Sequence, residues 1–361
     1  MERLILFHWS TLTGPEPIIQ YPPEKNFPSK DILLKIWTQH ELNQNESIIK
    51  LISEKDNNYY LSVIQQFEGE TYFLILVYKQ KDMIEDIIIK SPEILALISK
   101  NLIELINTNK ITRTISEAFN TILNYSKLDE EENLISFFQD KIKYTILKIL
   151  RKGVISKSEL TNKLRHEYGF STVNIDLILI SFLHENLLVK EIVPGSKECY
   201  FLVKDLTCAR IPPKNLPSDQ IIENYTSRLQ ESLKGYYSEY ANISDFENKT
   251  IINSVLFNKE VFFLLRTLRE KQLSVNECLI LLNNKEELFD ELLNEKFIFE
   301  LKGFVTIFSD VRFIKFTPTY IIKELVKRYN KQEISLNEYT THLKLLTKNI
   351  KDISDPNYEI V

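Results

Sequence analysis

Glycine is scarce in this chain, with only seven among 361 residues. The glycines stand singly at positions 14, 69, 153, 169, 195, 235 and 303. The sequence therefore contains neither Gly-x-x-x-x-Gly-Lys nor Gly-x-Gly-x-x-Gly, the patterns whose backbone amides cradle nucleotide phosphates. We expect the chain to bind no nucleotide cofactor on its own.

Cysteine and histidine are also sparse. Cys199, Cys208 and Cys278 are irregularly spaced, which in a chain of this length favours buried apolar side chains over a disulfide frame or a metal site. The five histidines are dispersed, and none has the His-x-x-x-His or His-Glu-x-x-His spacing of a zinc site. The residues also form no catalytic constellation. The sequence thus predicts a chain without metal, cofactor or enzymatic activity.

Long apolar runs are absent: no stretch of about 18 apolar residues occurs, and the N-terminus lacks the pattern of a signal peptide. The expected location is the cytoplasm, with any membrane contact made through partners rather than by an integral membrane segment. The formal net charge of −5 gives no general attraction to nucleic acid or anionic membranes. Nucleic acid is therefore not an expected partner unless a local basic patch binds it.

Residues 1–108 read as two strands, a helix, three strands and further helix. Apolar Leu4–Trp9 is followed by Gly14-Pro15, a glycine that can take positive φ before a proline that fixes its own, so a hairpin is expected. The run Tyr72–Val77 is apolar throughout, as in a central strand covered on both faces. Helices are expected near 29–40, 83–90 and 93–107. The prediction is an α+β domain with a five-stranded antiparallel sheet and helices against it.

The rest of the chain shows one pattern twice: three helices followed by a β-hairpin, which is the element order of a winged helix. The expected segments are a linker helix at 109–136 with an acidic end at 129–132, winged helix 1 at 137–205, a proline-stiffened connector and polar helix at 206–250, winged helix 2 at 251–315, and a helical C-terminal segment at 316–361.

The third helix of each winged helix argues against DNA reading. In DNA-binding proteins that helix enters the major groove and presents Arg, Lys, Asn or Gln to the bases. Residues 171–185 contain no Lys or Arg, and residues 285–295 carry five carboxylates against one lysine. Carboxylates beside DNA phosphates repel them. We therefore interpret both winged helices as protein-interaction modules.

A basic run in the first two helices of winged helix 1 is the counter-signal. It comprises Lys141, Lys143, Lys148, Arg151, Lys152, Lys157, Lys163 and Arg165. The run is either a solvated face beside the acidic linker or a contact to a nucleic-acid backbone. In the second case Lys152, Lys157, Lys163 and Arg165 are the candidate contacts, without base readout.

Candidate partner-binding residues are aromatic and acidic side chains of the first domain. Trp9 shares a strand face with Phe7, and Trp37 on the first helix belongs either to the core or to an interface, where aromatic residues are enriched. Phe67, Glu68 and Glu70 flank the turn expected before the last strand.

The N-terminal element order, with Phe7-His8-Trp9, Gly14-Pro15 and Tyr21-Pro22, resembles the longin or roadblock-like domain that opens nitrogen permease regulator-like proteins. Those proteins likewise follow a longin domain with winged-helix modules and a helical C-terminal part. The resemblance implies pairing of longin domains through sheet edges or first helices, and regulation of Ras-like or Rag-like small GTPases. Members of the family can supply an arginine finger from the loop before the last long strand, but Gln65–Thr71 contains no arginine. A regulatory or scaffold subunit is thus expected rather than an activating catalyst.

The leading hypothesis is a non-enzymatic intracellular adaptor. It binds a small GTPase or another longin/roadblock protein, in a homo- or hetero-oligomer, while its winged helices dock onto further subunits. Membrane-traffic assembly, with winged helices stacked as in sorting-complex subunits, overlaps this hypothesis. The alternative is a winged-helix transcription regulator with an N-terminal sensing or dimerisation domain.

Overall fold

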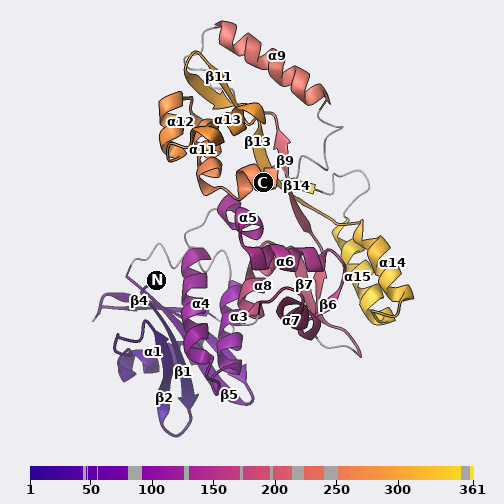
Figure 1. The fold of residues 1–361 in the computed structure, drawn as a ribbon. Coiled ribbons are helices and arrows are strands. Elements are labelled where there is room, and N and C mark those ends of the chain that lie inside the picture. The colour runs from indigo at the N-terminus through magenta and orange to yellow at the C-terminus, as the bar shows by residue number, and fades with distance from the viewer. Residues whose placement is uncertain are drawn as a thin grey trace. The chain divides into compact units, whose positions relative to one another are not determined.

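The computed structural model describes residues 1–43, 46, 48–54, 56–79, 92–125, 130–170, 174–195, 198–213, 223–239, 251–350 and 358–361. They group into two units, drawn in Figure 1: unit 1 comprises residues 1–129 and 165–186, and unit 2 comprises residues 130–164 and 187–361. The chain is mixed α and β, and it has the expected five-stranded antiparallel sheet near its N-terminus. The helix predicted over 83–90 lies outside the described residues.

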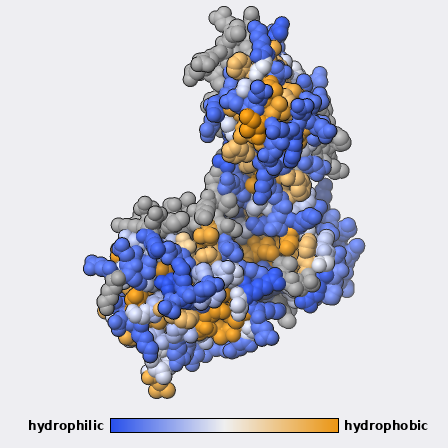
Figure 2. All heavy atoms as spheres, turned by 60° about the vertical axis from the view of Figure 1, so that its left-hand side comes forward, coloured by the Kyte–Doolittle hydropathy of each residue, from blue (hydrophilic) through white to orange (hydrophobic). Residues whose placement is uncertain are grey.

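The sheet of unit 1 contains β1 Arg3–Ser10, β2 Gly14–Tyr21, β3 Ile48–Ser53, β4 Asn58–Phe67 and β5 Glu70–Tyr78. Its strands lie in the order β2-β1-β5-β4-β3, and all neighbours are antiparallel. β5 is central and its residues 73–78 are buried, which confirms the prediction from its apolar run. The β1–β2 turn, where Gly14 has a φ of 79°, carries Leu12, which is 95% exposed. Figure 2 shows such hydrophobic side chains at the surface among mainly hydrophilic ones.

One face of this sheet packs against α1 Lys30–Leu42. Helical spacing puts Leu33 and Ile36 on the buried side of α1, where they meet Ile5 and Phe7 of β1. Successive side chains of a strand point to opposite faces, so every second residue of β1 belongs to this core.

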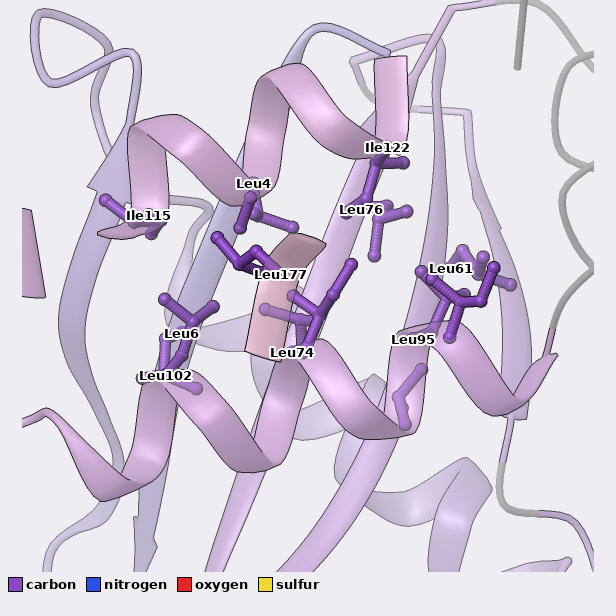
Figure 3. Close-up of a cluster of buried hydrophobic side chains, with 14 of the residues drawn as sticks. Leu4, Leu6, Leu61, Leu74, Leu76, Leu95, Leu102, Ile115, Ile122 and Leu177 are labelled. Atoms are coloured by element: carbon purple, nitrogen blue, oxygen red, sulfur yellow. The ribbon is translucent and has the colours of Figure 1, made fainter. Parts of the chain in front are cut away.

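The other face packs against α3 Pro92–Glu104 and α4 Ile111–Tyr125. Figure 3 shows this core, with Leu4, Leu6, Leu61, Leu74 and Leu76 of the sheet lying among Ile115 and Ile122 of one helix and Leu95 and Leu102 of the other. α8 Ile175–His184 belongs to the same unit and contributes Leu177 and Ile180. Both faces of β1 and β5 are therefore covered, as their apolar sequences require.

The remainder of the chain repeats one run of elements. Repeat 1 contains α6 Lys141–Leu150, β6 Ile155–Ser156, α7 Lys157–His166, α8, β7 Leu188–Ile192, β8 Glu198–Leu202 and β9 Asp205–Ile211. Repeat 2 contains α11 Lys259–Glu270, β10 Leu273–Ser274, α12 Val275–Leu281, α13 Glu286–Asn294, β11 Ile298–Leu301, β12 Phe304–Ile307 and β13 Asp310–Phe316. Each repeat has a three-stranded sheet, in the orders β6-β8-β7 and β10-β12-β11. The chain passes into unit 1 near the end of α7 and returns after α8.

The same arginine–aspartate contact closes both repeats. In repeat 1, Arg151 after α6 donates from Nε to Asp205 at 3.0 Å and from Nη2 to the carbonyl of the next residue at 2.8 Å. In repeat 2, Arg269 of α11 donates from Nε to Asp310 at 2.7 Å and from Nη2 to the following carbonyl at 2.9 Å. Both aspartates are 2% exposed. We refer to each contact as the clamp of its repeat, and the matching geometry indicates two copies of one module.

The two repeats also share a sheet. β9 pairs with β13 along its whole length, with Asp205 opposite Phe316 and Ile211 opposite Asp310, and β14 Tyr358–Ile360 adds a third strand. The first part of the segment expected as a connector, 206–250, is therefore strand β9. The segment expected to be helical, 316–361, begins with the last residue of β13, and strand β14 Tyr358–Ile360 lies near its end. Sequence pattern could not pair β9 with a strand about one hundred residues away.

The acidic run expected as a linker end is only partly described: residues 130–132 form the first turn of α5 Glu130–Gln139. Their carboxylates face repeat 2, because Glu131 accepts from Arg269 Nη1 at 2.7 Å and from Arg312 Nη1 at 2.7 Å. Glu130 accepts from Lys315 at 3.2 Å. These carboxylates thus balance cations of repeat 2.

Two helical segments connect the repeats, α9 Glu223–Glu239 and the π-helix η2 Ile251–Leu256. After β13, α14 Ile321–Asn330 and α15 Leu336–Asn349 form a helical hairpin that packs on repeat 1. Arg328 donates to the carbonyl of Val154 at 2.7 Å. The expected C-terminal helical segment thus contains two helices, and they pack on the first repeat.

The three cysteines are free and buried, as the sequence predicted. Burial raises the pKa of Cys199, Cys208 and Cys278 to about 12 in each case. At neutral pH they are therefore un-ionised apolar side chains.

Replacing Gly153 tests the contact between repeat 1 and α14. Gly153 has a φ of 105°, and an added Cβ would lie 2.7 Å from Cδ2 of Leu325. We expect Gly153→Ala to lower the free energy of unfolding by about 3 kcal/mol, from backbone strain and overpacking together. Gly195→Ala is the matched control, because Gly195 also has a positive φ but open space around its Cβ, and it should cost about 1 kcal/mol. Equal losses in urea denaturation would contradict a close contact at Gly153.

His342 makes the stability of unit 2 sensitive to acid. Its ring is fully buried, Nε2 lies 3.0 Å from the carbonyl oxygen of Leu202, and burial lowers its pKa to about 4. The unfolded chain takes up this proton below pH 6.5 while the folded chain does not, so stability falls as pH drops from 6.5 towards 4. Between pH 7 and 5 we expect a loss of about 2 kcal/mol that His342→Gln removes, read by urea denaturation followed by circular dichroism. If the free energy of unfolding of His342→Gln fell with pH as steeply as that of the wild type, His342 would not be the source of the acid sensitivity.

Candidate protein-interaction surface

The residues proposed for partner binding gather at one end of the sheet in unit 1. β1 pairs with β5 so that Trp9 lies opposite Thr71, and β4 pairs with β5 so that Phe67 lies opposite Glu70. The β1–β2 turn and the β4–β5 turn therefore lie at the same end, which we call the hairpin end. Trp9, Phe67, Glu68 and Glu70 all belong to it by strand register.

Trp37 reaches the hairpin end through a stack with Trp9. The two rings are 4.3 Å apart between centroids and within 2° of parallel. Both side chains are half-buried, and they pack on the edge of the core beneath α1. Leu34, one turn earlier in α1, is 41% exposed. Trp37 is therefore partly core and partly surface, and the two rings form an apolar surface on the α1 face.

The β4–β5 turn is a two-residue hairpin with positive φ at both central residues, 51° at Glu68 and 85° at Gly69. This is the type I′ geometry that matches the twist of the flanking strands. The turn holds the Glu68 side chain in solvent, while Phe67 packs against the core beneath α3 and α4. Phe67 is thus on the opposite face of the sheet from Trp9.

His8 joins the two hairpins on that opposite face. Its Nε2 lies 2.7 Å from Glu70 and its Nδ1 lies 3.5 Å from Glu16. The pKa of Glu16 is lowered first by the hydroxyl of Thr13 and then by His8. The hairpin end therefore presents carboxylates on one face and a tryptophan stack on the other.

The two edges of the sheet differ in a way that sequence analysis missed. On β2, Pro15 and Pro17 stand two residues apart, so the same edge lacks two successive N–H donors. β3 reads Ile-Ile-Lys-Leu-Ile-Ser and contains no proline. Its Ile52 is 60% exposed. The signal was present in the sequence, but only the strand order shows that β2 and β3 are the edges.

The four basic residues proposed to contact nucleic acid lie in different environments. Lys152 and Lys163 line one hollow in unit 2. Lys157 is half-buried. The pKa of nearby Glu198 is lowered by Lys190, then by Tyr200, with a smaller contribution from Lys157. Arg165 is exposed and belongs to unit 1. These four residues therefore do not form one continuous basic stripe within either unit.

The third helices present no basic face. α8 is buried at six of its ten positions, including Leu177 and Ile180 in the core of unit 1. α13 buries Phe289 and Leu292 and exposes Glu286, Glu287, Asp290 and Glu291.

Comparisons with known proteins give no further guide: no protein-family model, no curated protein and no solved structure matches this chain. Within the described residues, no three His, Cys, Asp or Glu side chains cluster as metal ligands would. No helix in the described part of the chain has the length and apolar character needed to cross a membrane.

Glu68 allows the shape of the turn to be separated from its charge. Asparagine tolerates positive φ better than glutamate, so Glu68→Asn should raise the free energy of unfolding by about 0.5–1 kcal/mol. Glu68→Gln removes the same charge without relieving the backbone and should leave stability within about 0.5 kcal/mol. Thermal denaturation of both variants measures the difference. Equal effects of Asn and Gln would show that backbone strain at Glu68 is not significant.

Proposed function

We propose that this chain is a non-enzymatic adaptor or regulatory subunit whose N-terminal unit is a longin-like domain. The support is the order of elements in unit 1: a hairpin, a helix on one face, three more strands, and helices on the other face. This is the architecture that the resemblance to nitrogen permease regulator-like proteins implied. The two repeats, each a run of helices followed by a hairpin, are its proposed winged-helix modules.

The β3 edge, which pairs with no strand other than β4 among the described residues, carries the proposal. An edge strand exposes a row of backbone N–H and C=O groups, and proteins commonly block such rows with proline, charge or a bulge. The β2 edge is blocked in this way, by Pro15 and Pro17 and by an irregularity opposite Leu6–Phe7. β3 carries one charge, Lys50, among four aliphatic residues. The β2 edge is thus protected against strand pairing and the β3 edge is not. This difference is what we expect of a domain that pairs with one partner strand, at β3.

The partner we propose for β3 is the sheet edge of another longin/roadblock domain. Such a partner supplies a strand of its own, so main-chain hydrogen bonds provide affinity while side chains on alternate faces provide specificity. Ile52 lies on one face of β3 and Leu51 on the other, so apolar side chains flank the proposed junction between the two sheets on both faces. The complex would then contain one sheet continuous across two chains.

A small Ras-like or Rag-like GTPase is the second partner class that we propose, at the hairpin end. The Trp9–Trp37 stack offers an apolar surface on one face of this end, Glu16 and Glu70 supply carboxylates on the other face, and Glu68 lies in the turn between them. That combination fits a partner with a basic, partly apolar surface. Because the β4–β5 turn has no arginine, the chain would position or regulate a GTPase rather than complete its active site.

A transcription regulator is the weaker proposal. Its reading helix in repeat 1 would be α8, whose apolar side chains are committed to the core of unit 1. In repeat 2 it would be α13, whose exposed face is acidic. Both observations favour protein contacts for the repeats. As an adaptor the chain would act in the cytoplasm, reaching membranes through its partners in trafficking or regulatory assemblies.

Ile52→Lys tests the β3 edge against a matched control. The partner is first identified by affinity capture of the full-length chain from native extract after nuclease treatment, and its affinity is then measured with purified proteins. A lysine on an edge strand opposes strand pairing, so we expect Ile52→Lys to weaken binding by about 10-fold or more. Ile192→Lys makes the same change on strand β7 of unit 2, where Ile192 is 81% exposed, and should leave binding unchanged.

Both isoleucines are exposed, so neither change should alter stability by more than about 0.5 kcal/mol. Wild-type affinity in Ile52→Lys would remove β3 as the docking edge. A chain that stays monomeric and recovers no GTPase, longin or roadblock protein would contradict the adaptor itself. A sequence-selective, salt-sensitive DNA complex in the nanomolar range would favour the transcription regulator instead.

A further inference from the structure

A hollow of about 290 Å³ in unit 2 is lined mainly by positive charge. Its walls are the end of α6, strand β6, helix α7 and the helix α14 with the turn after it. The cationic side chains are Lys152, Lys163, Lys327, Arg328 and Lys331. Two carboxylates, Glu324 and Glu333, and two isoleucines complete the lining. The volume is close to the lower end of the roughly 300–1,000 Å³ typical of small-molecule sites.

This charge is unusual for the chain that carries it. The whole protein has a formal net charge of −5, yet the lining has five cations against two carboxylates. The cations come from segments almost two hundred residues apart, since Lys152 and Lys163 belong to repeat 1 while the other three belong to α14 and its end. The fold thus gathers like charges that repel one another unless an anion lies between them.

Two of the lysine ion pairs at the hollow are long, whereas Lys163 lies 3.3 Å from Glu159. Lys327 lies 3.8 Å from Glu324, and Lys331 lies 4.0 Å from Glu333. In the described part of the chain, no ion pair is found for Lys152, and its side chain is exposed. Ammonium groups held at such distances can move to a phosphate oxygen, which they bind at about 2.7–2.9 Å.

Arg328 gives the hollow a fixed element. Its side chain is 11% exposed, and Nη1 donates to the carbonyl of Val154 at 2.7 Å. Nη2 lies 3.8 Å from Glu159, and Nε lies 3.4 Å from Glu333. Close packing of Gly153 on Leu325 holds α14 against repeat 1 beside it. The guanidinium is therefore preorganised, while the lysines around it are free to adjust.

The lining also indicates the kind of anion. Among the described residues that line the hollow there is no aromatic side chain, so a nucleobase finds no ring to stack on. The two carboxylates accept hydrogen bonds and therefore suit hydroxyl groups placed between phosphates. We propose that the hollow binds a compact polyol carrying several phosphate groups, of the inositol polyphosphate class, either free or as the headgroup of a phosphoinositide lipid.

The test is isothermal titration of the full-length chain with inositol hexakisphosphate. We expect saturable one-to-one binding that weakens as salt is raised. Lys327→Gln/Lys331→Gln should reduce affinity by about 10-fold or more, because it removes two charge-assisted contacts. Lys344→Gln/Lys348→Gln is the matched control: it removes two exposed lysines with the same spacing from α15, outside the hollow, and should leave affinity unchanged.

Three comparison arms complete the design. Phosphatidylcholine vesicles with or without phosphatidylinositol bisphosphate distinguish the two sources. If the chain binds only vesicles that contain the bisphosphate, and not free inositol hexakisphosphate, the hollow is a lipid-headgroup site. If it binds only the free inositol phosphate, the ligand is a soluble one. ATP tests the class, and it should bind more weakly than the inositol phosphate.

Several results would overturn the proposal. These are no binding to either free ligand or phosphoinositide vesicles, equal affinity for ATP, or the same loss of affinity in both lysine pairs. Tight duplex DNA binding that depends on Lys327 and Lys331, without saturable inositol phosphate binding, would assign the charge to nucleic acid instead. The hollow lies in unit 2 and the β3 edge in unit 1, so this proposal and the adaptor proposal succeed or fail separately.

Discussion

The clamp between an arginine and a buried aspartate is the interaction on which the second unit depends, and the chain uses it twice. Arg151 with Asp205, and Arg269 with Asp310, connect the first helix of each repeat to the strand that leaves its hairpin. A carboxylate this deeply buried needs its partner, because removing one member of a buried pair costs about 3–5 kcal/mol. Asp205 also accepts from Tyr320, and Asp310 from Arg312. The clamps therefore set where β9 and β13 begin, and hence the sheet that joins the repeats.

Local sequence patterns predicted the local elements well. The five strands of unit 1, the three-helix runs and the small hairpins were all expected, because alternation and helical spacing report which side of an element is buried. Long-range pairing was not predicted. β9 looked like part of a proline-stiffened connector, since its only ladder partners are distant in the chain. Arg151 was counted with the surface cations, although it holds a buried aspartate.

The candidate site was predicted in composition but not in arrangement. Nothing in the sequence indicates that Trp9 and Trp37 are in contact, whereas in the structure their rings stack on each other. The β3 edge was not predicted, because which strands lie at the edges depends on strand order, and strand order cannot be read from a single sequence. Lys152 and Lys163 were assigned to a possible backbone contact with nucleic acid, whereas the fold places them around a hollow with cations of α14. In each case the missing information was a contact between segments far apart in the chain.

The central functional claim is that β3 accepts a strand from another sheet. The most direct measurement is amide hydrogen exchange of the full-length chain, alone and in complex with the longin or roadblock protein recovered from native extract. We predict that amides of Ile48–Ser53 become protected in the complex while those of Gly14–Tyr21 are unchanged. Protection confined to other surfaces, with Ile48–Ser53 exchanging as in the free chain, would contradict it.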